Sequence, residues 1–291
     1  MSHHVSVLEI DGKALAYNLN YFKKKLKPDT KVLAVVKAFG YGSDGVQVAQ
    51  FLQDKVDYFG VAYTQEGIAL REAGVQNPIL VLHPQLQNLE KIIDYCLEPN
   101  LYHFKIFDTF STLCATKQLN NYPVHLKINT GLNRLGFTPD EALDLIPKLI
   151  ENKAVRIASI FSHLAASEDK NATDFTNSQI EKFRSTAEKL TKVLHQRPIW
   201  HILNTSGVIN YPNAQFDMVR IGIGLYGFGN DDEETAQLKN THNLRSIISQ
   251  IHTIAPGDSV GYNFGFRATK PTRSATIPIG HADGIPRGLG K

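Results

Sequence analysis

The stretch Val32-Leu33-Ala34-Val35-Val36-Lys37-Ala38-Phe39-Gly40-Tyr41-Gly42 joins an apolar run of strand length to a lysine and a loop with two glycines. An ammonium group is costly to remove from water, so a lysine at the end of a buried strand needs a reason. In one interpretation Lys37 simply extends into solvent. In the other it points into a pocket, where its amine can form a Schiff base with a carbonyl cofactor such as pyridoxal phosphate.

Length and composition narrow the class of protein. The 291 residues are enough for one large α/β barrel and a smaller piece. The net charge of +3 gives no broad basic field, so we expect neither nucleic acid nor membrane as a partner. The N-terminus lacks the pattern of a signal peptide, and the 2 cysteines lack metal-ligand spacing. We therefore expect a cytoplasmic protein with reduced thiols and no metal site.

Strand and helix patterns alternate along most of the chain. The expected strands are 5–10, 32–37, 58–62, 78–82, 101–107, 124–128, 155–161, 199–203 and 217–221. Helical spacing of apolar residues falls at 13–26, 45–52, 65–73, 139–150 and 177–194. About eight strand–helix units after the first strand are typical of a parallel (β/α)8, TIM-like barrel.

The pattern changes after residue 229. A short acidic run leads into expected strands at 244–254, 258–262 and 274–279, with little helix between them. We expect an N-terminal strand at 1–10 that joins a β domain, a barrel at 11–229, a connection at 230–240, and a C-terminal, mainly-β domain at 241–291. This last domain stops in mid-pattern, so we expect it to be truncated.

Polar residues follow five of the expected barrel strands. They are Lys37, Lys127 with the segment 129–134, Ser162-His163, Asn204-Thr205-Ser206, and Arg220 followed by Gly222. Each alone has an ordinary explanation, since His163 could be a buried structural histidine, Asn204 a turn residue and Arg220 half of an ion pair. The active site of a β/α barrel lies at the carboxyl ends of its strands, so five polar groups there predict a site.

Seven motifs extend this pattern along nearly the whole chain. They are Ala34-Val35-Val36-Lys37-Ala38, the segment His125–Gly136, Ser162-His163-Leu164-Ala165, His201-Ile202-Leu203-Asn204-Thr205-Ser206, Asp217–Gly227, Gly257–Tyr262 and Ala275–Gly284. In this order they resemble the motifs of the alanine racemase family. Asn129, Thr205 and His281 depart from it, since the family usually has aspartate, serine and tyrosine there.

The resemblance implies a cofactor and two bases. Lys37 would hold pyridoxal phosphate and serve as one proton-transfer base. Tyr262 would be the opposite base, acting in the partner's site of a homodimer. Arg220 would face the pyridine nitrogen, and His163 would link Arg220 to Tyr262 by hydrogen bonds.

The resemblance also assigns the remaining site residues. The cofactor-binding group comprises Lys37, Tyr41, His163, Asn204, Thr205, Arg220, Gly222 and Ile223, with the phosphate held by Tyr41, Thr205 and the backbone near Gly222. Arg134 would bind the substrate carboxylate. Lys127 stands where some members of the family carry a carbamylated lysine that supports this arginine.

The implied activity is the interconversion of L-alanine and D-alanine, which supplies D-alanine for peptidoglycan. Three alternatives stay open: a racemase for another amino acid, a non-catalytic pyridoxal phosphate-binding barrel, and a decarboxylase. Tyr262 argues against the second, and Arg220 argues against the third. The variants at 38–42 and 201–204 are similar to the racemase part of proteins fused to a D-alanyl-D-alanine-adding ligase.

Overall fold

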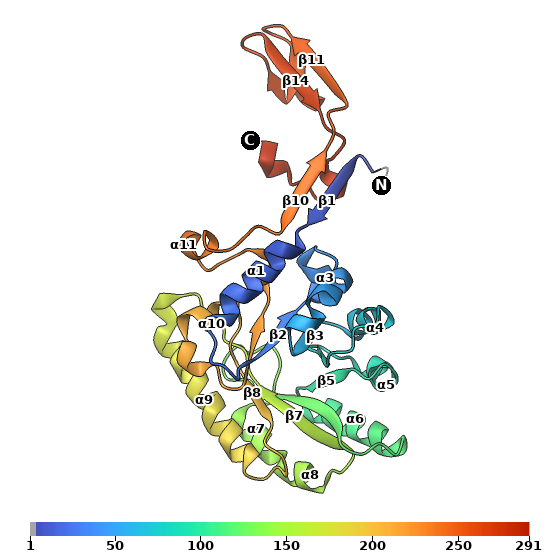
Figure 1. Ribbon diagram of the computed structural model, residues 1–291, viewed down its shortest axis with the longest axis vertical. Helices are drawn as coiled ribbons and strands as arrows, with labels where there is room; N and C mark the ends of the chain where they lie inside the picture. The colour runs from blue at the N-terminus through green and yellow to red at the C-terminus, as the bar shows by residue number, and fades with distance from the viewer. Residues whose placement is uncertain (1–3, 291) are drawn as a thin grey trace. The chain divides into compact units, whose positions relative to one another are not determined.

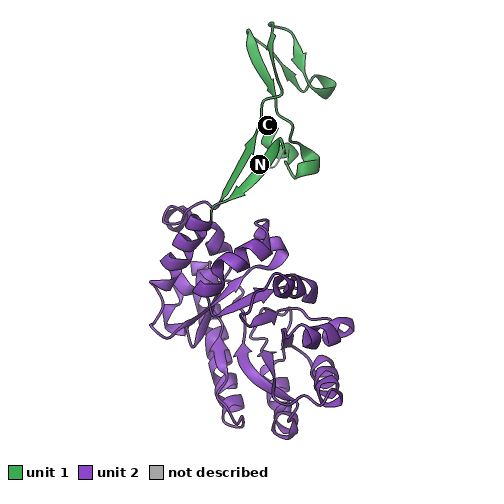
Figure 2. Ribbon diagram, turned by 45° about the vertical axis from the view of Figure 1, so that its right-hand side comes forward, with its two compact units in different colours: residues 1–11, 242–291 green, residues 12–241 purple. Residues whose placement is uncertain are grey.

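The computed structural model describes residues 4–290, so residues 1–3 of the predicted N-terminal strand and residue 291 lie outside the described part. The chain divides into two compact units (Figure 2). One is Gly12–Thr241, and the other combines the N-terminal residues through Asp11 with the segment from His242 onward.

The larger unit is built on an eight-stranded parallel sheet with the order β8-β7-β6-β5-β4-β3-β2-β9 (Figure 1). The strands are β2 (Lys31–Val35), β3 (Tyr58–Val61), β4 (Ile79–Val81), β5 (Glu98–Leu101), β6 (Tyr122–Lys127), β7 (Val155–Phe161), β8 (Ile199–His201) and β9 (Met218–Ile221). Beside β8 and β9, the Arg220 N–H donates to the Leu203 carbonyl at 3.0 Å and the Asp217 N–H to that of Trp200 at 3.0 Å. The sheet is thus a nearly closed barrel, and the predicted fold class is confirmed.

Helices follow most of these strands (Figure 1). They are α1 (Gly12–Lys23), α2 (Lys37–Tyr41), α3 (Gly45–Leu52), α4 (Thr64–Glu72), α5 (Leu89–Asp94), α6 (Phe104–Thr116), α7 (Pro139–Asp144), α8 (Ile146–Glu151), α9 (Thr173–Thr191), α10 (Thr205–Asn210) and α11 (Asp232–Thr235). Each longer helix buries one apolar face, as α1 does with Leu15, Leu19 and Phe22. This amphipathic pattern is what fixes a helix to the outside of a barrel.

The strand predicted at 101–107 is wrong. The strand is β5, which ends at Leu101, and α6 begins at Phe104. His103 caps this helix, since its Nδ1 accepts a hydrogen bond from the Ile106 N–H at 3.1 Å. Buried side chains recur along α6 at helical spacing, namely Ile106, Phe107, Phe110 and Cys114. A short apolar run does not by itself distinguish a strand from a buried helix face.

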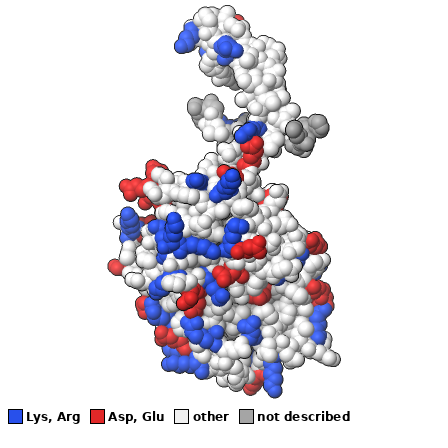
Figure 3. All heavy atoms as spheres, in the orientation of Figure 1, with Lys and Arg blue, Asp and Glu red and all other residues white. Residues whose placement is uncertain are grey.

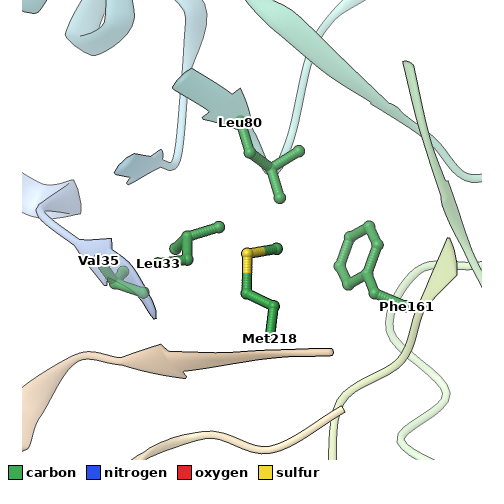
Figure 4. Packing of buried hydrophobic residues seen from close by; sticks show 5 residues of the cluster. All are labelled: Leu33, Val35, Leu80, Phe161 and Met218. Carbon is green, nitrogen blue, oxygen red and sulfur yellow. The ribbon is translucent and has the colours of Figure 1, made fainter. Parts of the chain in front are cut away.

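The barrel interior contains a compact apolar cluster of Leu33, Val35, Leu80, Phe161 and Met218 (Figure 4). Burying side chains of this kind stabilises a fold by about 1.5–3 kcal/mol each. Phe161, at the end of β7, also lines the cavity described below, so the same ring belongs to the core and to the candidate site.

The smaller unit consists of paired antiparallel strands. β1 (Ser6–Ile10) pairs with β10 (His242–Ser246), β11 (Gln250–Ile254) with β14 (Thr272–Thr276), and β12 (Ser259–Val260) with β13 (Phe266–Arg267). The range 244–254, expected as one strand, is therefore split between β10 and β11. Glu9 and Arg245 form an ion pair of 2.8 Å across the first of these pairs.

The surface carries charges of both signs. Figure 3 shows basic and acidic side chains interspersed over the face of the Gly12–Thr241 unit that is in view. Within residues 4–290, no helix combines the length and the apolar character that crossing a bilayer requires. Cys96 is exposed and Cys114 is buried, and both are unpaired.

Candidate active site

A cavity of about 550 Å³ collects the residues that follow the barrel strands. Ten predicted site residues line it: Lys37, Tyr41, Lys127, Arg134, His163, Asn204, Thr205, Arg220, Gly222 and Ile223. Its volume lies in the range of about 300–1,000 Å³ that is usual for small-molecule sites. Tyr262 belongs to the other unit, where it begins a 3₁₀ turn (Tyr262–Phe264) with a fully exposed side chain.

Lys37 is presented by a left-handed turn and does not belong to β2, which ends at Val35. The residues with positive φ, between 52° and 62°, are Ala38, Phe39, Gly40 and Tyr41. Each non-glycine residue in this conformation costs on the order of 1–2 kcal/mol. Gly40 has a further requirement, because a Cβ there would lie 2.8 Å from the backbone nitrogen of Gly45. The strain is thus concentrated directly after the candidate cofactor lysine.

The surroundings of Lys37 favour its neutral amine. Burial lowers the pKa of the Lys37 ammonium, and the charge of Arg134 lowers it further, while Glu66 opposes the shift. The Glu66 carboxylate is engaged elsewhere, since it accepts hydrogen bonds from the backbone N–H groups of Ala38 at 2.8 Å and Ala62 at 2.6 Å. A neutral amine is the form that attacks a carbonyl carbon.

Arg220 is the most fully enclosed cation of the cavity, with 4% of its surface exposed. Its guanidinium donates to Nδ1 of His201 at 2.7 Å, to Nδ1 of His163 at 3.0 Å, and to the carbonyls of Ser162 at 2.7 Å and Ile202 at 2.9 Å. A guanidinium has no acceptor, so both imidazoles must present an unprotonated Nδ1. Burial lowers the pKa of Arg220 to about 9, which leaves it charged at neutral pH.

His201 and Phe161 lie beside Arg220, and neither is predicted from the sequence as a site residue. The His201 ring stacks on Phe161 with centroids 4.9 Å apart and planes within 4°. The same Phe161 ring has Arg220 at 5.5 Å and the Lys127 ammonium at 5.6 Å from its centroid. Successive side chains of a strand point to opposite faces of the sheet. This alternation is the sequence signal that could place His201 inside the barrel.

Lys127 is the fourth basic side chain of the cavity, beside Lys37, Arg134 and Arg220. It is 6% exposed, and burial, followed by the charges of Arg220, Arg134 and Lys37, lowers its pKa to about 7. These four basic side chains line the cavity without any carboxylate among its described lining residues. The donor set therefore fits a ligand with several negative charges and a carbonyl carbon, and pyridoxal phosphate together with an amino-acid carboxylate has that character.

The cavity lining also supplies neutral donors. Thr205 Oγ1 accepts a hydrogen bond from the Gly222 N–H at 3.1 Å, which leaves the hydroxyl hydrogen available to a ligand. A Cβ on Gly222 would lie 2.8 Å from the Tyr41 hydroxyl, so the backbone and this phenol approach closely. Burial raises the pKa of Tyr41, which keeps it a donor. The threonine that departs from the family pattern retains the hydroxyl.

Asn204 and Asn129 stabilise the loops that carry the site residues. Asn204 lines the cavity, and its Oδ1 caps α10 by accepting from the Gly207 N–H at 2.9 Å. Asn129 shapes the turn before Arg134, since its Oδ1 accepts from the Asn133 N–H at 3.0 Å and its Nδ2 donates to Asn133 Oδ1 at 3.0 Å. The neutral amide at position 129 thus holds this turn without adding a negative charge.

The fold and the cavity define a class: a β/α barrel protein with a pocket rich in lysine and arginine at its strand ends, and with a separate β unit. Comparison with known proteins identifies the family. "Alanine racemase, N-terminal domain" matches residues 10–230, and "Alanine racemase, C-terminal domain" matches residues 241–291. The chain belongs to the alanine racemase family.

Individual relatives agree with this assignment. The alanine racemase of Synechocystis sp. is 35% identical over 287 residues, which cover 97% of this chain and 77% of that protein. The structure of alanine racemase from Clostridium difficile 630 has a TM-score of 0.92 at 30% identity and covers 99% of this chain and 76% of its own. Alanine racemase from Bartonella henselae, with covalently bound pyridoxal phosphate, has a TM-score of 0.84 at 29% identity, with coverages of 98% and 78%.

Proposed function

We propose that this protein interconverts L-alanine and D-alanine by a two-base racemisation that depends on pyridoxal phosphate. The observation that carries the proposal is the placement of Lys37 and Arg220 in one cation-rich cavity. The relatives named alanine racemase and the neighbour with covalently bound pyridoxal phosphate support the same reaction and cofactor. The barrel predicted at 11–229 would hold the cofactor, and the β domain predicted at 241–291 would contribute Tyr262.

Different residues of the chain would bind different parts of the cofactor. Lys37 Nζ would hold it covalently, and Tyr41, Thr205 and the backbone near Gly222 and Ile223 would bind its phosphate. His163 and Asn204 would complete the wall around it. Once bound, pyridoxal phosphate withdraws electrons from the substrate amino acid and makes its Cα proton acidic.

Two bases would then move the proton. Lys37 Nζ would remove or return the Cα proton on one face of the substrate, and burial, which lowers the pKa of its ammonium, favours the neutral amine that accepts a proton. Tyr262 Oη, from the partner of a homodimer, would act on the other face. A second base is needed because one lysine does not readily reach both faces of a planar carbon.

Arg220, Arg134 and Lys127 would set the electrostatics. Arg220 would donate to the pyridine nitrogen and keep its own proton, which withholds a proton from that nitrogen and favours rapid return of the Cα proton over side reactions. Arg134 would bind the substrate carboxylate. Lys127 would stand beside it as a carbamate, a form that its low pKa favours.

The wider setting is part of the proposal. We propose that the enzyme works in the cytoplasm and supplies D-alanine for peptidoglycan. The motif variants at 38–42 and 201–204 further support a parent protein in which the racemase is fused to a D-alanyl-D-alanine-adding ligase.

Proton NMR of L-alanine in heavy water, with the protein and added pyridoxal phosphate, tests the proposal. We expect the Cα proton signal to disappear while D-alanine accumulates in a parallel assay, and Lys37→Ala to prevent both. L-serine and L-lysine in separate tubes test another amino-acid specificity. Cofactor binding without exchange would indicate a non-catalytic carrier, and release of carbon dioxide a decarboxylase; either result would overturn the assignment.

A further inference from the structure

A chain of hydrogen bonds joins five side chains inside the barrel, one from each of five successive strands. They are Glu98 on β5, His125 on β6, Ser159 on β7, His201 on β8 and Arg220 on β9. The Arg220 guanidinium lies 2.7 Å from His201 Nδ1, and His201 Nε2 lies 2.9 Å from Ser159 Oγ. Ser159 Oγ lies 2.6 Å from His125 Nδ1, and His125 Nε2 lies 2.7 Å from the Glu98 carboxylate.

The donor-only guanidinium at one end and the acceptor-only carboxylate at the other, with neutral imidazoles between them, give every bond in the chain a direction. Arg220 only donates, so His201 Nδ1 accepts and the ring carries its proton on Nε2. That proton is donated to Ser159. At the other end Glu98 accepts from Nε2 of a neutral His125, so His125 Nδ1 accepts the Ser159 hydroxyl proton. His125 in turn carries its proton on Nε2 and donates it to Glu98. All the dipoles are therefore aligned from a buried cation toward a carboxylate.

The energetics of burial explain why these polar groups occupy a barrel interior. Such positions are usually filled by branched apolar side chains. Here His125, Ser159 and His201 are completely buried, and Arg220 is nearly so. The other groups that accept from Arg220 are neutral: His163 and backbone carbonyls. A buried cation without a counter-charge is costly, and Glu98, whose side chain is 12% exposed, is the carboxylate at which the chain ends.

We propose that Glu98 is a positioning residue for Arg220 and acts on it through His125, Ser159 and His201. The carboxylate compensates the guanidinium charge, and the chain fixes both histidines as Nε2–H tautomers. Arg220 is thereby held as a donor toward the cavity. The link to catalysis rests on the proposed function, because that function assigns Arg220 to the cofactor ring, whereas the tautomers do not depend on it.

Nitrogen-15 NMR of histidine-labelled protein without cofactor tests the chain directly. We expect the rings of His125 and His201 to be neutral, with the proton on Nε2 in both, and with each signal assigned by its loss in His125→Gln or His201→Gln. We expect Glu98→Gln to shift the ring signals of His201, three hydrogen bonds away. Either ring with its proton on Nδ1, or no response of His201, would overturn the proposal.

A double-mutant cycle tests the link to the reaction. Glu98→Gln removes the charge at the end of the chain, and Ser159→Ala removes the two bonds in its middle. Each should lower kcat about tenfold, with the KM for alanine changed by less than about twofold. The double variant should lose no more than the worse single variant, because either change breaks the same chain. Glu72→Gln, at a carboxylate that accepts from the Tyr95 hydroxyl at 3.3 Å, is the matched control and should leave kcat unchanged.

Additive losses, or an unchanged kcat in Glu98→Gln, would show that the carboxylate does not act through the chain. If wild-type protein forms no D-alanine, the proposed function fails, and the tautomer measurement still decides the proposal for Glu98.

Discussion

The Arg220 guanidinium donates to Nδ1 of His163 across 3.0 Å, and through its other arm to Nδ1 of His201 across 2.7 Å. Neither imidazole can take a second proton without losing this bond. Burial, and then the Arg220 charge, hold the pKa of both histidines well below the ordinary value. Both rings are therefore neutral in the folded protein at physiological pH.

This arrangement predicts that stability falls in mild acid. The unfolded chain binds protons at these histidines below about pH 6.5 while the folded chain does not, so stability is lost as pH falls through that value. Between pH 7.5 and 5.5 the two sites together should cost about 2–3 kcal/mol in the free energy of unfolding. Urea titrations at several pH values measure this loss. His163→Gln should remove about half of the slope of the free energy of unfolding against pH.

The exposed His252 offers the matched control, since His252→Gln makes the same substitution where the ring is open to water. It should keep the wild-type slope. An unchanged slope in His163→Gln would refute the account of this buried histidine.

The close approach of Gly222 to Tyr41 predicts a cofactor-binding defect. A Cβ in Gly222→Ala would lie 2.8 Å from the Tyr41 hydroxyl and would push the phenol off the proposed phosphate site. Overpacking of this kind costs about 1–3 kcal/mol, so the dissociation constant for pyridoxal phosphate should rise roughly tenfold or more. Absorbance titration measures it. Gly280→Ala has open space around the new Cβ and should bind like wild type; equal affinities of both variants would contradict the proposed phosphate site.

Tyr262→Phe tests the two-base scheme. Racemisation should fall about 10²–10⁴-fold, because a general base contributes that much, while cofactor absorbance stays unchanged. Lys37 remains, so the variant should still exchange the Cα proton of one alanine enantiomer in heavy water, but not of the other. Tyr17→Phe, on the exposed face of α1, should change neither reading. Full racemase activity in Tyr262→Phe would refute the scheme.

Lys127 should react with carbon dioxide. With a pKa of about 7, roughly half of its amine is neutral at pH 7 and able to form a carbamate, in which a nitrogen–carbon bond forms and the amine proton leaves to water. Carbon-13 NMR in labelled bicarbonate should show one carbamate signal that grows as pH rises through about 7. Lys127→Arg should abolish it.

The control for this measurement is Lys148→Arg, since Lys148 is exposed and paired with Asp108 at 2.6 Å. It should leave the carbamate signal intact. A signal that survives in Lys127→Arg would place the carbamate elsewhere.

The sequence by itself determined the barrel and most of its site. Alternating strand and helix patterns are local properties, and parallel strands joined by helices have few arrangements open to them. Polar residues at the ends of such strands must meet at one rim of the barrel. The sequence alone therefore predicts that one cavity contains Lys37, Lys127, His163, Asn204 and Arg220.

Tertiary structure alone decided what depends on neighbours from other strands. The helix at 104–116 replaced an expected strand because packing, and not the apolar run itself, selects between them. The lowered pKa of Lys127 arises from burial and from three cations on other segments. The chain from Glu98 to Arg220 exists only because closure of the barrel brings five strands within hydrogen-bond distance, and no local pattern encodes that contact.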